Sequence, residues 1–313
     1  MSTLSQHTLK NPIHCSGIGV HSGLRVSMTL NPAEADSGIV FRRTDVEGVE
    51  LQAHWKNAVE TPLCTTLVAE NGQKVSTIEH LMSAFVACGI DNALVEISAE
   101  EVPIMDGSAA PFVFLIECAG RARQDAPRRA IRILKDVSVE EPHRAASFVP
   151  GEGFTVDFDI DFDNDLVSRQ SWSGAITEET FKSEISRART FGFLHEVEQL
   201  RKMGLARGGS LDNAVVIDGD KVMNEGGLRF KDEFVRHKVL DSIGDLYLAG
   251  APILGHFTGH KAGHALNLRL LVELFSDQDA WEWVEMTEDD LEPGIIAAAG
   301  NALPSIRAAA ASV

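Results

Sequence analysis

The sequence of 313 residues contains no long apolar run. No hydrophobic segment approaches the ~20 apolar residues that a membrane-spanning helix requires. The N-terminal stretch MSTLSQHTLKN also lacks the apolar core of a secretory signal peptide. We therefore expect a cytoplasmic protein that has no transmembrane segment and makes at most transient contact with a membrane.

Positive charge and paired cysteines are scarce as well. The chain has 28 Lys and Arg against 46 Asp and Glu, a formal net charge of -18. Such a surface disfavours nucleic acid and anionic lipid as partners, so an anionic ligand would need a local basic pocket. The cysteines form no CxxC pair, which is typical of a reducing compartment. They are Cys15, Cys64, Cys88 and Cys118.

The hydrophobic patterns predict a mixture of strands and helices. Residues 24–30 and 154–163 alternate apolar and polar side chains, as half-buried strands do. Helical patterns occupy residues 76–89, 177–188, 234–250 and 265–275. Because strands and helices occur in both halves of a chain long enough for two domains, we expect an α+β fold.

A short charged segment that contains proline, RARQDAPRRA at residues 121–130, is the candidate linker. We expect an N-terminal α+β domain of residues 1–126 and a C-terminal α+β domain of residues 127–313. Each would be a layer of β-sheet packed with α-helices. The final IRAAAASV is interpreted as a helix end that frays into a disordered tail.

The segment FVRHKVLDSIGDLYL, residues 234–248, carries three polar residues at helical spacing. His237, Asp241 and Asp245 follow one another every four residues and lie on one stripe. Apolar residues fill most of the remaining surface, so we expect the helix to be buried. A buried carboxylate must be paired, protonated or bound to a metal ion. His237 and Asp241 are therefore either a hydrogen-bonded pair or two ligands of a metal ion that needs a third.

His80 is the best candidate for the third ligand because it lies on an otherwise apolar helical segment, STIEHLMSAF. The preceding residue, Glu79, has two interpretations. It completes a capping box with Ser76, or it acts as a general base beside the metal. The sequence alone weights the two interpretations equally.

Three histidines recur every four residues in GHFTGHKAGHALN. Because a glycine precedes each of them, we predict a loop that runs into a helix from Ala265, rather than one continuous helix. His264 would lie near the N-terminus of that helix and could act as an acid. His256 and His260 are interpreted as exposed loop histidines.

Six blocks of sequence occur in one order along the chain: TIEHLMSAFVACGIDNALVEI, PIMDGSAAPFV, ISRARTFGFL, GLARGGSLDNAVV, GLRFKDEFVRHKVLDSIGDL and KAGHALN. Together they resemble the UDP-3-O-acyl-N-acetylglucosamine deacetylase family of bacterial lipid A biosynthesis. The resemblance covers nearly the whole chain and is loose only at the extreme C-terminus and at residues 136–152. It implies a zinc hydrolase of two domains with the active site between them. The implied reaction removes the N-acetyl group of UDP-3-O-(3-hydroxyacyl)-N-acetylglucosamine as acetate, an early committed step of lipid A biosynthesis.

The resemblance also implies a role for each candidate. Zinc, or iron(II) in its place in the cell, would be held by His80, His237 and Asp241. Glu79 would be the general base, so the resemblance favours this role over that of a capping residue. His264 would be the protonated acid that aids the leaving amine, and Asp245 would orient it and raise its pKa. Thr190 would help to hold the developing oxyanion.

The implied substrate contacts are Phe191, Lys238, Cys64 and Arg144. Arg144 would face the nucleotide diphosphate. Glu196 stands where the family often has Asp, which can change a contact to the sugar or the acyl chain. Residues 191–211 would line an apolar channel for that chain, although ordinary core packing would explain the same apolar side chains.

Two other classes of protein remain open. Two histidines and a carboxylate also form the facial triad of non-haem iron(II) oxygenases. Those enzymes usually carry a closer H-x-D pair, and the adjacent Glu79 suits hydrolysis better. A binding protein stapled by zinc would need a closed site with four ligands, of which three are visible. We expect a monomer whose partner is its UDP-3-O-acyl-N-acetylglucosamine substrate, with no nucleic-acid partner.

Overall fold

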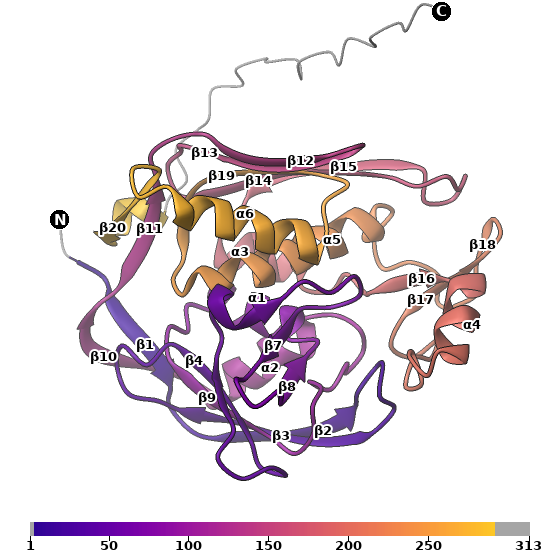
Figure 1. Cartoon of the computed structure of the whole chain (residues 1–313), viewed down its shortest axis with the longest axis horizontal. Coiled ribbons are helices and arrows are strands. Elements are labelled where there is room, and N and C mark those ends of the chain that lie inside the picture. Colours follow the sequence, from indigo (N-terminus) through magenta and orange to yellow (C-terminus); the bar gives the residue numbers. More distant parts are fainter. Residues whose placement is uncertain (1–2, 292–313) are drawn as a thin grey trace, which may run out of the picture.

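The computed structural model describes residues 3–291 of the chain. Helices lie between two β-sheets that form the outer layers (Figure 1). One outer sheet is built from residues 13–97 and the other from residues 129–285. The predicted α+β class is confirmed.

The first outer sheet has five strands in the order β2-β3-β9-β4-β5. They are β2 (Ile13–Ile18), β3 (Arg25–Pro32), β4 (Ile39–Arg43), β5 (Glu50–Gln52) and β9 (Ala93–Ile97). β4 runs parallel to β9, and the other pairs are antiparallel. The alternation predicted for residues 24–30 is found in β3, where Val26, Met28 and Leu30 are buried.

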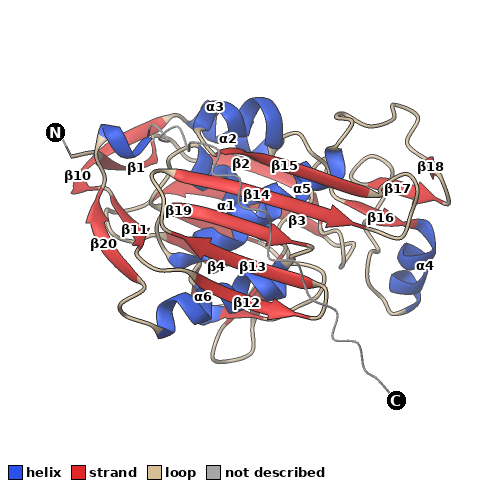
Figure 2. Cartoon of the chain, turned by 90° about the horizontal axis from the view of Figure 1, so that it is seen from above, coloured by secondary structure: helices blue, strands red, loops and turns tan. Residues whose placement is uncertain are grey.

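The second outer sheet has seven strands, of which β15, β14, β19, β13 and β12 lie side by side (Figure 2). β11 pairs with the first two residues of β19, Ile253 and Leu254, and β20 pairs with β11. The strands are β11 (Arg129–Ile133), β12 (Val137–Glu141), β13 (Arg144–Val149), β14 (Phe154–Asp161), β15 (Arg169–Ala175), β19 (Ile253–His260) and β20 (Trp281–Glu285). β14 confirms the second predicted strand.

β19 corrects the loop predicted before Ala265. His256 and His260 lie on this central strand, which pairs with β13, β14 and β11. Its glycines serve close packing within the sheet. A Cβ atom at Gly259 would lie 2.4 Å from the ring of Phe158, and one at Gly255 would lie 2.7 Å from Ile133. The prediction of a loop was wrong because a glycine in a strand can mark a close approach as well as a turn.

Three smaller sheets complete the strands. They are β1 (Ser5–Leu9) with β10 (Arg121–Pro127); β6 (Ala58–Val59), β7 (Thr66–Val68) and β8 (Lys74–Ser76); and β16 (Phe191–Phe193), β17 (Val215–Asp218) and β18 (Lys221–Val222). The candidate linker is therefore not a loop, because most of it forms β10, antiparallel to β1. It does connect the two outer sheets, since β11 follows directly. The division at residues 126 and 127 stays a prediction.

The helices are α1 (Glu79–Ala87), α2 (Ala110–Ala119), α3 (Glu178–Thr180), α4 (Leu194–Lys202), α5 (Glu233–Leu246) and α6 (His264–Ser276). Short 3-10 turns occupy Trp55–Asn57, Tyr247–Ala249 and Glu288–Leu291, and Phe181–Ile185 form a π-helical turn. Every residue of α5 is buried except Arg236 and Lys238, which confirms the expected buried helix. Within residues 3–291, no helix has the length and apolarity needed to cross a membrane. The tail segment IRAAAASV lies outside the described residues.

The start of α1 differs from the capping box expected for Ser76 and Glu79. The helix begins at Glu79 itself, and Ile78 before it provides no side-chain cap. Ser76 belongs to β8, and its hydroxyl accepts a hydrogen bond from Thr66 at 3.2 Å. The capping interpretation is wrong because the sheet takes the residue that would have capped the helix. The Glu79 side chain is thus free for another role.

A buried ion pair ties the start of α5 to the segment before β16. The Arg189 Nε atom lies 2.8 Å from Glu233 Oε1, and the backbone N–H of Arg189 donates to the same oxygen at 3.0 Å. The Glu233 side chain is 0% exposed and that of Arg189 is 10% exposed. Charged side chains that are removed from water need such pairing. The contact therefore holds the segment around Arg189 beside the start of α5.

Replacing Glu233 by Ala should therefore be strongly destabilising, because it leaves the Arg189 charge buried without its partner. We expect Glu233→Ala to lower the free energy of unfolding in urea by about 3–5 kcal/mol. The control is Glu50→Ala, which breaks the exposed Arg42–Glu50 pair of 2.7 Å and should cost less than about 1 kcal/mol. Equal, small losses in both variants would contradict the structural importance of the buried pair.

Candidate metal centre

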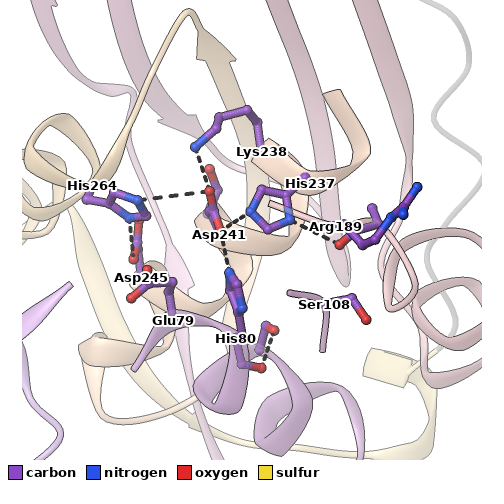
Figure 3. Close-up of polar contacts among 12 residues, drawn as sticks. Glu79, His80, Ser108, Arg189, His237, Lys238, Asp241, Asp245 and His264 are labelled. Atoms are coloured by element: carbon purple, nitrogen blue, oxygen red, sulfur yellow. Dashed lines mark hydrogen bonds and ion pairs between the residues drawn. The ribbon is translucent and has the colours of Figure 1, made fainter. Parts of the chain in front are cut away.

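Three potential metal-binding side chains meet where α1 and α5 pack together (Figure 3). His80 comes from α1, and His237 and Asp241 come from successive turns of α5. The Oδ1 atom of Asp241 lies 3.5 Å from His80 Nε2 and 3.3 Å from His237 Nε2. One ligand atom from each residue lies within 4.8 Å of the others, and all three side chains are buried. The sequence prediction that these residues share one point in space is consistent with this geometry.

The protonation pattern around Asp241 fits a cation between the three side chains. His237 Nδ1 lies 3.0 Å from the carbonyl oxygen of Ala188 and donates its proton there, which leaves Nε2 with a lone pair toward Asp241. Burial lowers the pKa of His237 to about 3, so its imidazole is neutral. Asp241 Oδ1 is buried and has no hydrogen-bond partner among the described residues. A lone pair facing an unpaired carboxylate oxygen is unfavourable unless a positive ion lies between them.

The second oxygen of Asp241 is already satisfied. Lys238, which is half-buried on α5, donates to Asp241 Oδ2 at 2.6 Å. Although burial opposes ionisation, the positive charges of Lys238 and His264 hold the pKa of Asp241 well below its usual range. The carboxylate is therefore charged, with Oδ1 left for another cation.

His264 is the first residue of α6, and it lies on the side of Asp241 opposite to His237 (Figure 3). Its Nδ1 atom is 3.0 Å from Asp245 Oδ2, and its Nε2 atom is 3.9 Å from Asp241 Oδ2. Asn267 donates to Asp245 at 2.8 Å, and Thr65 donates to the other oxygen of the same carboxylate. Burial alone would lower the pKa of His264, but Asp245 and the other nearby carboxylates raise it to about 9. This imidazole is a cation whose Nε2–H points toward the cluster.

Glu79 is buried beside His80, and Figure 3 shows it next to Asp245 and His264. Its Oε2 atom accepts the backbone N–H of Thr65 at 3.0 Å. Burial raises the pKa of the Glu79 carboxyl above its ordinary value, so the carboxylate is a stronger base than one in water. A base and a cationic acid thus flank the three potential ligands.

Thr190 lies where residues from distant parts of the chain meet. Its backbone N–H donates to Gly107 at 2.8 Å, and its carbonyl oxygen accepts from Val215 at 2.8 Å. Phe191 follows it, with its ring centroid 6.4 Å from that of His237. Both predicted site residues are therefore held near α5.

The other two predicted substrate contacts differ in their surroundings. Cys64 is buried next to Thr65, and burial raises the pKa of its thiol to about 11. Arg144 starts β13 at an exposed position and pairs with Glu141, so its described contacts do not connect it to the cluster.

The prediction from sequence missed three residues that support this site, Glu233, Thr65 and Asn267. Glu233 lies four residues before His237, and Asn267 lies three residues after His264, so helical spacing could have identified both. Thr65 is 180 residues from the aspartate to which it donates, and no local pattern marks it.

The site is a buried cluster of two histidines and one carboxylate, flanked by a base and a cationic acid. Metal-dependent hydrolases are the class of protein that this arrangement fits best. A family model described as LpxC, UDP-3-O-acyl N-acetylglycosamine deacetylase, matches residues 6–276. The chain belongs to this family.

Similar proteins named UDP-3-O-acyl-N-acetylglucosamine deacetylase cover most of the chain. The protein from Hahella chejuensis is 55% identical over 284 residues, which span 90% of this chain and 94% of the relative. Those from Teredinibacter turnerae and Saccharophagus degradans are 53% and 50% identical, and each alignment spans 93% of this chain and 96% of the relative.

The contact between Asn267 and Asp245 predicts a pH-dependent loss of stability in Asn267→Asp. The new carboxyl would lie beside Asp245, so its pKa in the folded protein would be raised above the unfolded value. A carboxyl group whose pKa is higher in the folded than in the unfolded protein destabilises the folded state increasingly as pH rises. The loss of unfolding free energy relative to wild type should therefore grow from about pH 5 to about pH 8. At about pH 8 we expect Asn267→Asp to lower the free energy of unfolding in urea by about 2 kcal/mol.

The exposed Asn71 offers the matched control, because its side-chain oxygen accepts from Gln73 and a carboxylate can do the same. Asn71→Asp should show no such pH dependence. A pH-independent loss in Asn267→Asp would contradict the interpretation of this contact.

Proposed function

We propose that this chain hydrolyses the N-acetyl group of UDP-3-O-(3-hydroxyacyl)-N-acetylglucosamine, giving acetate and the free amine. The family membership supports the reaction and its place as an early committed step of lipid A biosynthesis. The observation that carries the proposal is the buried His80–His237–Asp241 cluster, in which Asp241 Oδ1 has no hydrogen-bond partner within residues 3–291.

The proposed metal ligands are His80 Nε2, His237 Nε2 and Asp241 Oδ1. Zinc is the proposed ion, and iron(II) would be accepted by the same donor set in the cell. Three protein ligands suit a catalytic site, where the bound ion acidifies water and polarises the acyl oxygen.

Glu79 is proposed as the general base. The Thr65 N–H fixes one of its oxygens, which orients the other to take a proton from water. Its raised pKa matches a group that must accept this proton near neutral pH.

His264 is proposed as the acid that protonates the leaving nitrogen, because its Nε2–H faces the cluster while Asp245 holds its Nδ1–H. Thr190 is proposed to donate its hydroxyl to the developing oxyanion. Its backbone is held on both sides by hydrogen bonds to Gly107 and Val215, which fixes the point from which the hydroxyl projects. One such donor contributes roughly 3–4 kcal/mol of transition-state stabilisation.

Substrate contacts are proposed at Lys238, Phe191, Cys64 and Arg144, with Arg144 toward the diphosphate. The acyl chain is proposed to follow residues 191–211. The apolar residues predicted there are half-buried; Phe191 and Phe193 pack against the main core of the described residues, whereas the three leucines do not, and α4 has no buried residue, so the leucines are the proposed channel lining. The apolar residues are Phe191, Phe193, Leu194, Leu200 and Leu205.

We further propose that residues 1–126 and 127–313 are two domains that share the site. The first would supply Glu79 and His80, and the second the remaining ligands and acid. Because one chain supplies every candidate group, a monomer in the cytoplasm would suffice for the reaction.

Two substitutions should separate metal binding from proton transfer. His237→Ala removes a ligand, so the purified protein should lose its zinc. Glu79→Ala should keep zinc but lower kcat for acetate release at least about 100-fold, since it removes the base. Metal content by mass spectrometry and initial rates measure the two effects.

His256→Ala is the control, because His256 lies on β19 and bonds to Thr155 at 2.8 Å outside the cluster. It should retain both zinc and turnover. Near-normal turnover in Glu79→Ala would refute the base, and full zinc content in His237→Ala would refute the ligand.

A further inference from the structure

The two helices that carry the candidate ligands approach each other at a glycine. Gly244 lies three residues after Asp241 in α5 and faces the first turn of α1. A Cβ atom at this position would lie 2.0 Å from the carbonyl oxygen of Glu79 and 2.8 Å from its carbonyl carbon. Real Cβ atoms do not approach other atoms within 3.0 Å, so no other residue fits at this separation of the backbones.

The helix itself gives no reason for a glycine here. Gly244 lies inside α5, and its φ is not in the left-handed region. Glycine in a helix interior is less favourable than alanine by about 1 kcal/mol. The close approach to Glu79 accounts for a residue that local propensity disfavours.

The position of the contact connects it to the ligands. The carbonyl group of Glu79 belongs to the peptide bond that joins Glu79 to His80. A side chain on Gly244 would have to displace this peptide by about 1 Å to reach an allowed contact, and His80 would move with it. Metal–ligand distances vary by only about 0.2 Å, so such a shift would separate His80 from the ligands on α5.

We propose that Gly244 is a positioning residue for the metal site. The absence of a side chain sets the α1–α5 separation at which His80 meets His237 and Asp241. The inference rests on the proposed metal-dependent function, because it concerns the same site. It assigns no contact between Gly244 and metal or substrate.

Gly208 lies in the segment proposed for the acyl chain but near none of the proposed metal ligands in sequence, so it is a matched control for zinc binding rather than for turnover. A Cβ atom there would lie 2.2 Å from the carbonyl oxygen of Gly19, so the close approach is of the same kind. It also joins the first part of the chain to the second, but through the β2–β3 connection rather than through α1 and α5. Gly208→Ala thus loosens the packing of the two parts without pressing on a ligand-bearing helix.

The test compares zinc affinity in metal-free wild type, Gly244→Ala and Gly208→Ala, by competition with a chromophoric chelator. We expect Gly244→Ala to bind zinc at least about 10-fold more weakly and to change the visible absorption spectrum of bound cobalt(II). Gly208→Ala should bind zinc within about twofold of wild type, since no ligand shifts. Equal affinity of Gly244→Ala and wild type, or equal losses in both variants, would overturn the positioning role.

A second measurement does not require a stable metal-free protein. The variants are produced with zinc, and the rate of zinc release to excess chelator is measured. Faster release from Gly244→Ala than from Gly208→Ala supports the proposal, and equal rates overturn it. Failure of the wild-type protein to bind zinc would instead refute the proposed function.

Discussion

The site depends on one buried oxygen atom. Asp241 Oδ1 lies within 3.5 Å of two imidazole nitrogens and has no hydrogen-bond donor among the residues described. A charged oxygen in such surroundings is costly unless a cation compensates it. The burial of α5, the lone pair of His237 and the approach of α1 with His80 all serve this single requirement.

The charged groups around that oxygen form separate pairs. Lys238 neutralises the outer oxygen of Asp241, and Asp245 holds His264 as a cation on the opposite side. Glu79 lies beside His264, and its Oε2 atom accepts the backbone N–H of Thr65 at 3.0 Å. The proposed acid and base can therefore coexist beside the proposed metal position, because each carboxylate already has a separate hydrogen-bond partner.

The helical parts of this arrangement could be predicted from the sequence, because helical spacing is local. The stripe of His237, Asp241 and Asp245 gave the buried helix, and His264 was placed correctly at the start of α6. β19 was missed because glycines that make room for Phe158 look like turn residues in one dimension. The contact of Gly244 with Glu79 joins residues far apart in the chain, so no local pattern could show it.

The central claim is tested most directly by acetate release from UDP-3-O-(3-hydroxyacyl)-N-acetylglucosamine. The rate is measured with purified protein before chelation, after chelation and after zinc is restored. Release that stops on chelation and returns with zinc is the predicted result. No release from folded, zinc-loaded protein across several acyl lengths, or release that persists in fully metal-free protein, would contradict the account.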